Sequence, residues 1–236
     1  MADGVESANI VGYSTSDLVG GKSNMQGINF VKVDGTDFDL NADITVANLT
    51  GGADATTADA ILVWDPVKSG YTTFYYYYEA EYPDDAAWYD ANFVLDPKLS
   101  AGSAFWFRAV AGDEKAITVA GAVESDDSVT YNLVGGKSNM ILNPYPTTLN
   151  LNDATAVEVV NLTGGADATT ADAVLVWNPV KSGYTTFYYY YEAEYPDDAA
   201  WYDANFVLDP VLPSGTAFWF RAVAGEGKAI TFKKNY

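Results

Sequence analysis

Short runs of β-branched and aromatic residues, separated by turn residues, extend along the whole chain. Residues of these types favour β-strands, and in the first half the runs are Ala60–Trp64, Tyr71–Ala80, Ala104–Val110 and Lys115–Val123. Short strands joined by turns at this spacing predict antiparallel β-sandwich or barrel domains. Two further segments, 54–60 and 84–92, have the composition of single short helices.

The strand predicted over residues 71–80 is aromatic on both faces. Alternate residues point to opposite sides of a strand, so Phe74 and Tyr76 share one face while Tyr75 and Tyr77 share the other. A strand that has one face in water normally alternates apolar and polar residues. Three interpretations stay open: the tyrosines fill a core beneath Glu79–Gly102, they meet another subunit, or they form a carbohydrate platform. The platform would consist of Tyr75, Tyr77, Trp88, Tyr188, Tyr190 and Trp201.

The chain consists of two copies of one unit. Residues 48–97 and 161–210 align without a gap over 50 positions and differ only at Ile61 against Val174 and Asp65 against Asn178. Self-similarity over a whole-domain period is typical of a chain built from repeated structural units. We therefore expect an all-β chain of two tandem antiparallel β-sandwich or barrel domains, residues 1–120 and 121–236, that arose by internal duplication.

The two copies diverge most just ahead of the near-identical block, in residues 26–47 of the first and 141–160 of the second. Two explanations are open. Either recent duplication or gene conversion homogenised only the middle of each copy, or the diverged segments face different neighbours in the folded protein.

Composition removes many functional classes. The chain has no cysteine and no histidine, which excludes thiol nucleophiles, zinc sites built on thiolates or imidazoles, and acid–base schemes that use imidazole. Its 32 acidic and 12 basic residues give a net charge of −20, which opposes binding to nucleic acids and to anionic membranes. No apolar run is long enough to span a bilayer. We expect a non-enzymatic protein with no nucleic-acid partner and no membrane insertion.

An acidic segment follows the tyrosines. Between Glu79 and Asp96 there are six acidic residues and no basic one. Calcium prefers several oxygen ligands, although the spacing fits no EF-hand loop. The segment is therefore either a calcium site or a solvated acidic loop, and no other cofactor is implied. The candidate ligands in the two copies are Asp84, Asp85, Asp90, Asp197, Asp198 and Asp203.

The ends of the copies suggest a way to self-associate. The joining segment 120–131 aligns with residues 2–13 at the start of the chain, with six of twelve positions identical. If this segment pairs with the repeat before it, the second repeat has a vacant sheet edge that the N-terminus of another molecule fills, which gives a head-to-tail oligomer or filament. If it belongs to the repeat that follows, no edge is vacant. The contact residues expected from the first alternative are Val5, Glu6, Ser7, Val11, Tyr13, Ile230, Phe232 and Tyr236.

The motif GTAFWFRAVAG…AIT, preceded by VWxPxxxGYTTF, covers most of each repeat. It resembles secreted β-rich repeat proteins of environmental bacteria, and this resemblance implies an extracellular or cell-surface location. The architecture is more loosely similar to bacterial surface fibre subunits that assemble by strand donation. Neither resemblance transfers a catalytic residue. We expect a structural subunit of a fibre or surface layer, with a tandem carbohydrate-binding or adhesin module that binds glycans as the alternative.

Overall fold

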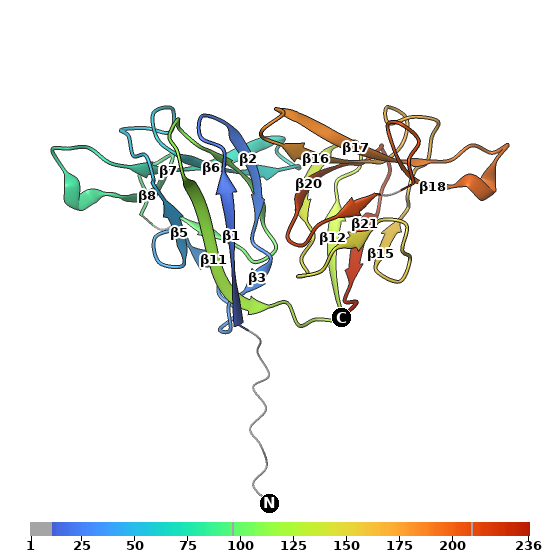
Figure 1. Cartoon of the computed structure of the whole chain (residues 1–236), viewed down its shortest axis with the longest axis horizontal. Coiled ribbons are helices and arrows are strands. Elements are labelled where there is room, and N and C mark those ends of the chain that lie inside the picture. Colours follow the sequence, from blue (N-terminus) through green and yellow to red (C-terminus); the bar gives the residue numbers. More distant parts are fainter. Residues whose placement is uncertain (1–10, 96, 209) are drawn as a thin grey trace, which may run out of the picture.

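The computed structural model describes residues 11–95, 97–208 and 210–236, and it is all-β. The two repeats lie side by side (Figure 1). The first repeat contains β1 (Val11–Leu18), β2 (Ser23–Gly27), β3 (Phe30–Val31), β4 (Phe38–Asp39), β5 (Ile44–Ala47), β6 (Ala60–Asp65), β7 (Gly70–Tyr77), the 3₁₀ turn η1 (Pro83–Asp85), β8 (Ala87–Asp90), β9 (Lys98–Leu99), β10 (Ala104–Arg108) and β11 (Lys115–Val123).

The second repeat follows the same plan, without a counterpart of β3. Its elements are β12 (Ser128–Leu133), β13 (Ser138–Leu142), β14 (Leu149–Asn150), β15 (Val157–Val160), β16 (Ala173–Asn178), β17 (Gly183–Tyr190), the 3₁₀ turn η2 (Pro196–Asp198), β18 (Ala200–Asp203), β19 (Val211–Leu212), β20 (Ala217–Arg221) and β21 (Lys228–Lys233).

Each repeat is a sandwich of a five-stranded antiparallel sheet and a smaller one. The large sheets have the orders β2-β10-β6-β7-β8 and β13-β20-β16-β17-β18, and they form the upper layer in Figure 1. Below them lie the sheets β1-β11-β3, in which β5 also pairs with β11, and β12-β21-β15. Two-stranded sheets, β4-β9 and β14-β19, complete the repeats. The predicted β-sandwich class is therefore confirmed.

Strand alternation fills the space between the two sheets with apolar side chains. In β10, Phe105 and Phe107 point inward and are fully buried, while Trp106 and Arg108 point to the opposite face and are half-buried. Phe74 and Trp88 complete the same core from β7 and β8. Removing this apolar surface from water is the main stabilising contribution, about 25 cal/mol per Å². The outer faces of the large sheets are thus free to carry aromatic and charged residues.

A buried ion pair fixes the loop that precedes β6. The Lys115 ammonium lies 2.7 Å from the Asp59 carboxylate, and both side chains are at most 1% exposed. The ammonium also donates to the Asn48 carbonyl and the Thr50 hydroxyl, while the carboxylate accepts from the backbone N–H groups of Thr50 and Val110. Because every polar atom is satisfied, the pair is tolerated in the interior. Lys228 and Asp172 repeat this arrangement at 2.8 Å.

Neither predicted helix forms. In segment 54–60 the Asp54 carboxylate accepts hydrogen bonds from the N–H groups of Thr56 and Thr57, which closes a turn instead of continuing a helix. Segment 84–92 is strand β8 after the single turn η1. Its Trp88 and Tyr89 pair with β7 and point to opposite faces, and this alternation requires an extended backbone.

The vacant-edge hypothesis is wrong, because each repeat supplies its own first strand. β12 pairs with β21 along its whole length, with Tyr131 opposite Ile230. β1 pairs in the same way with β11, with Tyr13 opposite Ala120. Residue 120, the predicted domain boundary, lies inside β11, which continues to Val123.

Candidate functional site

The predicted carbohydrate platform is buried. Trp88 is 2% exposed within the main core, and Tyr75 and Tyr77 are 6% and 8% exposed on the other face of the sheet. A second apolar cluster covers these tyrosines, and Phe93 stacks on Tyr89 at 4.4 Å beside them. The equivalent residues of the second repeat, Tyr188, Tyr190 and Trp201, are equally buried. Of the three interpretations of the tyrosine strand, the core-filling one matches this geometry.

The predicted calcium ligands do not converge. Asp84 and Asp85 lie in the exposed turn η1, whereas the Asp90 carboxylate accepts the N–H groups of Asn92 and Val94 at 2.8 Å each. These bonds, first the one from Val94, lower the pKa of Asp90. No group of three or more acidic side chains suited to a metal occurs in the part of the chain that the structure describes. The second-repeat residues, Asp197, Asp198 and Asp203, have the same placement.

The predicted contact residues at the chain ends differ in location and in exposure. Val11 and Tyr13 are in β1 with side chains 69% and 77% exposed, while Ile230 and Phe232 are fully buried in β21. The Tyr236 hydroxyl donates to the Glu124 carbonyl at 2.9 Å. Val5, Glu6 and Ser7 lie outside the described residues. The structure therefore does not bring the five described residues of this set together into one surface.

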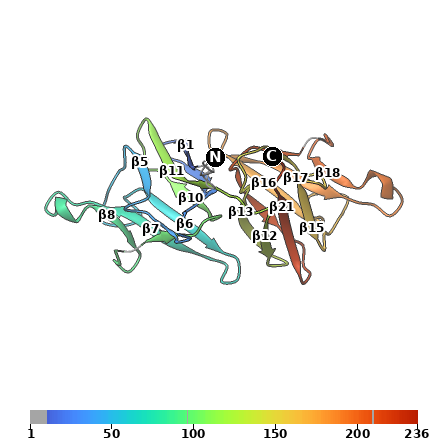
Figure 2. The same ribbon diagram turned by 90° about the horizontal axis from the view of Figure 1, so that it is seen from below.

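The two repeats meet through a pseudo-symmetric interface. The indole N–H of Trp64 donates to the Ser138 carbonyl at 2.7 Å, and that of Trp177 donates to the Ser23 carbonyl at the same distance. Lys22 and Lys137 likewise donate across the junction, to the hydroxyls of Ser182 and Ser69. Because each contact occurs twice with the repeats exchanged, the interface has the form of a two-fold dimer interface. Figure 2 shows the two repeats on either side of this junction.

Apolar side chains close the centre of the junction. Met25 and Met140 pack with Leu142 and two alanines. Here the pseudo-symmetry is broken, because Gly27 occupies the position in β2 that Leu142 occupies in β13. A side chain on Gly27 would begin 3.2 Å from Leu142, so only one of the two positions can hold a large residue. At this position, therefore, the two diverged segments meet each other with residues of different size.

Two aromatic pockets adjoin the junction. One has a volume of about 450 Å³ and is lined by Trp106 and Trp177, whose rings meet edge to face at 5.4 Å. The other, of about 320 Å³, is lined by Trp64 and Trp219, which meet at 5.6 Å. Tyr71 and Tyr184 line both pockets. We call the two pockets and their shared tyrosine walls the junction groove.

The junction groove also contains both arginines of the chain. Arg108 lines the larger pocket and Arg221 the smaller, and Nη2 of each is buried without a hydrogen-bond acceptor among the described residues. Burial raises the pKa values of Tyr71 and Tyr184, so both phenols stay neutral at physiological pH. The groove therefore combines flat apolar walls, two phenol groups, two guanidinium groups and, in the larger pocket, the ammonium of Lys22.

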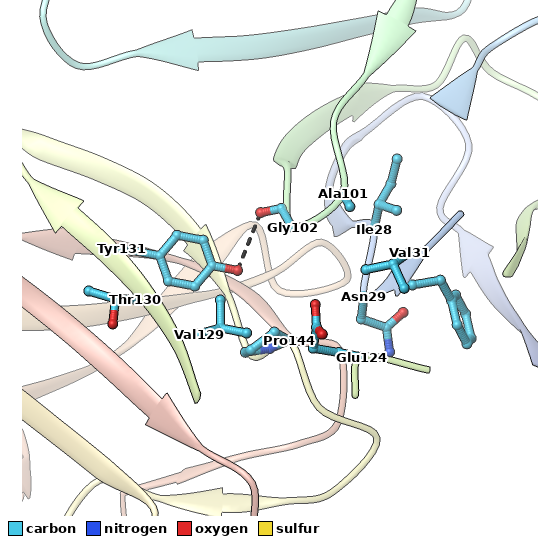
Figure 3. Close-up of a pocket in the computed structure, with 11 residues that line it drawn as sticks. Ile28, Asn29, Val31, Ala101, Gly102, Glu124, Val129, Thr130, Tyr131 and Pro144 are labelled. Atoms are coloured by element: carbon cyan, nitrogen blue, oxygen red, sulfur yellow. Dashed lines mark hydrogen bonds between the residues drawn. The ribbon is translucent and has the colours of Figure 1, made fainter. Parts of the chain in front are cut away.

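A smaller pocket of about 220 Å³ lies between the smaller sheets, with lining from both repeats (Figure 3). The Tyr131 hydroxyl reaches across it and donates to the Gly102 carbonyl at 3.4 Å. Burial raises the pKa of Tyr131, and nearby Glu124 raises it further. Glu124 is the one carboxylate among the lining residues, whereas glycoside hydrolysis normally uses two. This pocket does not provide that pair.

Sequence reasoning missed the junction groove, although a signal was present. Strand alternation alone puts Trp106 and Arg108 on one face of the strand 104–110 and Phe105 and Phe107 on the other. A face that alternates aromatic and cationic residues is unusual for a core. The partners, Trp177 and Tyr184, come from the other repeat, and single-repeat patterns cannot show such a contact.

None of the helical turns among the described residues is long and apolar enough to cross a membrane. Comparison of the chain with known protein families, with curated proteins and with solved structures finds no match.

Proposed function

We propose that the protein is a non-enzymatic saccharide-binding module that works outside the cell and holds its ligand in the junction groove. The observation that carries the proposal is the grouping of four of the six tryptophans around two adjoining pockets, with two tyrosines as shared walls. Concave sites with aromatic walls and a few fixed polar groups are typical of small-ligand binding.

The exposure of the groove residues suits a ligand better than a core. Tyr71 and Tyr184 are 44% and 43% exposed, and the four tryptophans are half-buried. The indole N–H groups of Trp64 and Trp177 bond to the opposite repeat, so these two walls are held rigidly. Rigid walls lower the entropic cost of binding. Flat rings of this kind can stack on the apolar faces of sugars.

The proposal includes no catalytic step. Imidazole and thiol groups are absent from the sequence, and no carboxylate lines either pocket of the junction groove. General acid–base catalysis needs a positioned proton donor or acceptor near the reacting bond. This lining therefore supports binding of a ligand without a chemical reaction.

A glycan array followed by calorimetric titration of the best ligand tests the proposal. The double variant Tyr71→Ala, Tyr184→Ala removes the shared walls, and we expect it to weaken binding at least about tenfold, since one large aromatic contact contributes 1.4 kcal/mol or more. Tyr78→Ala, Tyr191→Ala is the matched control, because these tyrosines are 45% and 44% exposed but lie at the opposite end of the same strands. Absence of any saturable saccharide binding, or equal losses in the two variants, would refute the proposal.

Self-assembly into a fibre or surface layer is a second proposal, on different grounds from a vacant strand edge. Phe93, Val94 and Leu95 follow the edge strand β8 and are each more than half exposed, and Phe206, Val207 and Leu208 repeat them beside β18. The chain thus carries the same apolar patch on the outer side of each repeat. A molecule with two equivalent adhesive ends can associate with further copies at both.

Sedimentation over a range of concentrations tests this second proposal. We expect association that increases with concentration and that Val94→Asp, Val207→Asp abolishes. Val67→Asp, Val180→Asp is the control, because these valines are 77% and 78% exposed in other turns. A protein that stays monomeric at high concentration, or association unaffected by the first variant, would end the proposal.

A further inference from the structure

We propose that the saccharide held in the junction groove is acidic and that two of its anionic groups, carboxylate or sulfate, pair with Arg108 and Arg221. This inference rests on the saccharide-binding function proposed above and names the class of ligand. It starts from the two guanidinium groups.

A guanidinium has five N–H donors and keeps its charge at all physiological pH values. In this chain Nη2 of both arginines is shielded within the protein and finds no acceptor among the described residues. A buried donor left unpaired is costly, especially on a charged group. The same unpaired donor occurs at equivalent positions of the two repeats, so it is a property of the repeat.

The surroundings of the arginines differ from those of the other buried cations. Lys115 and Lys228 each have an aspartate partner at 2.7 and 2.8 Å, and the half-buried Lys32 and Lys233 pair with acids too. The arginine pockets contain no carboxylate, although the chain has 32 acidic residues against 12 basic ones. An anion in the groove therefore meets no competing carboxylate, and it pairs with the parts of each guanidinium that line the pocket, since Nη2 itself is covered by protein atoms.

The chemistry of the acceptor follows from the guanidinium. Its planar fork matches the two oxygens of a carboxylate or a sulfate and forms short, charge-assisted hydrogen bonds with them. Neutral hydroxyl groups make weaker bonds to it. The adjacent tryptophan and tyrosine rings provide the stacking surface for the sugar that carries the anion.

The pseudo-symmetry sets the number of anionic groups. Each half of the groove has one arginine and two tryptophans, and the two halves share Tyr71 and Tyr184. The larger half also has Lys22, whose ammonium already donates to the Ser182 hydroxyl. A ligand that fills both halves presents one anion to each, which is the pattern of an oligosaccharide with acidic repeating units. The negative net charge opposes such a ligand at long range, but the acidic turns η1 and η2 lie at the far ends of the molecule (Figure 1).

The test is calorimetric titration of the full chain with oligosaccharides of galacturonic acid, with the same oligosaccharides after carboxyl reduction to neutral galactose, and with sulfated galactose oligosaccharides. We expect the acidic forms to bind at least about tenfold more tightly than the neutral form. The carboxylated and sulfated arms show which anion the groove prefers.

The matched variants are Arg108→Gln, Arg221→Gln and Lys68→Gln, Lys181→Gln. Both change the net charge by the same amount, but Lys68 is 82% exposed and pairs only with Asp65 at the surface, and Lys181 is also exposed in the equivalent turn. We expect the arginine variant to lose at least about 100-fold in affinity for the acidic ligand. The lysine variant should lose less than about threefold, because exposed charges are screened.

The outcomes separate the two proposals. If neutral and acidic oligosaccharides bind equally and the arginine variant binds normally, the ligand is not acidic, while the saccharide-binding function stands. If the lysine variant loses as much affinity for the acidic ligand as the arginine variant, the net charge explains the loss, and specific pairing with the arginines is refuted. If no saccharide of any kind binds, both proposals fail. Equal unfolding midpoints of the two variants in urea establish that a loss of binding reflects the site.

Discussion

The two repeats are most instructive where they differ. Their shared block builds the same ion pair, the same tryptophan contacts and the same turns twice, with distances that agree to within 0.1 Å for Lys115–Asp59 and Lys228–Asp172. The diverged segments build different structures: Phe30 and Val31 form β3 in the first repeat, whereas the second buries Tyr145 completely. The residues that build the ion pair of each repeat and the aromatic walls of the junction groove are therefore the same in both copies.

The centre of the junction explains the difference. A two-fold contact brings equivalent residues close to each other, so a large residue at the axis of an exact two-fold meets its own copy. Gly27 opposite Leu142 solves this packing problem with one small and one large residue. Divergence in this part of the repeat is therefore a requirement of packing two copies in one chain.

The largest effect is expected at the buried ion pair, which has the same surroundings in both repeats. Asp59→Asn should destabilise the first repeat by about 3–5 kcal/mol, because it leaves the buried Lys115 without its countercharge. Asp172→Asn should cost the second repeat the same amount, since the surroundings are equal. Hydrogen exchange measured by mass spectrometry assigns each loss to its own repeat. Unequal losses would show that the repeats differ in stability in ways that their contacts do not reveal.

A smaller effect is expected from exchanging the residues at the centre of the junction. Gly27→Leu should cost about 1–3 kcal/mol through overpacking against Leu142, and Leu142→Gly should cost about 2–5 kcal/mol through the cavity that it leaves. The double variant should recover part of both losses, because it restores one large and one small residue. Urea unfolding of the four proteins gives the coupling energy. Strictly additive losses would contradict the packing argument.

A weaker perturbation removes one hydrogen bond across the junction. Trp64→Phe should cost about 0.5–1.5 kcal/mol for the bond to the Ser138 carbonyl, in addition to lost ring area. Trp177→Phe should cost an equal amount, since its bond to Ser23 has the same length. Urea unfolding measures both. A clear difference between the two losses would mean that the two equivalent contacts contribute unequally to the free energy of unfolding.

The smallest effect concerns acid stability and distinguishes the diverged segments. The hydrogen bond from Lys32 lowers the pKa of Asp43 in the first repeat, and a backbone N–H lowers it further. Lys233 lowers the pKa of Glu158 in the second. A lowered carboxyl pKa stabilises the fold above the unfolded pKa, and this is lost as the pH falls through the folded value.

Below about pH 4, the original chain should therefore lose stability as the pH falls, and Asp43→Asn should reduce this pH dependence more than Glu158→Gln does. The reason is that Asp43 is the more shielded carboxylate, at 25% against 56% exposure. Unfolding midpoints measured from neutral to acidic pH test this order. The reverse order would show that the backbone bond to Asp43 contributes nothing.

The sequence predicts most of the fold and little of the site. Strand 115–123 was predicted with its observed bounds, because β-branched residues and turns act locally. The helix predicted over 84–92 was wrong, since the pairing of Trp88 and Tyr89 with β7 overrides an acidic first turn. The groove could not be predicted, because Trp64 meets Trp219 only after two repeats pack together. Of the candidate calcium ligands, Asp90 and Asp203 close turns with their carboxylates, and the other four lie in the exposed turns η1 and η2.

The unequal pair Gly27 and Leu142 also bears on how the chain folds. Neighbouring domains of near-identical sequence are prone to exchange strands or to dock with the wrong partner while they fold. Two second repeats from different molecules would place Leu142 against Leu142, and two first repeats would leave a void between glycines. Only a first repeat with a second fits, and the nearest second repeat is joined to it by a few residues. One glycine thereby directs each half toward its own chain.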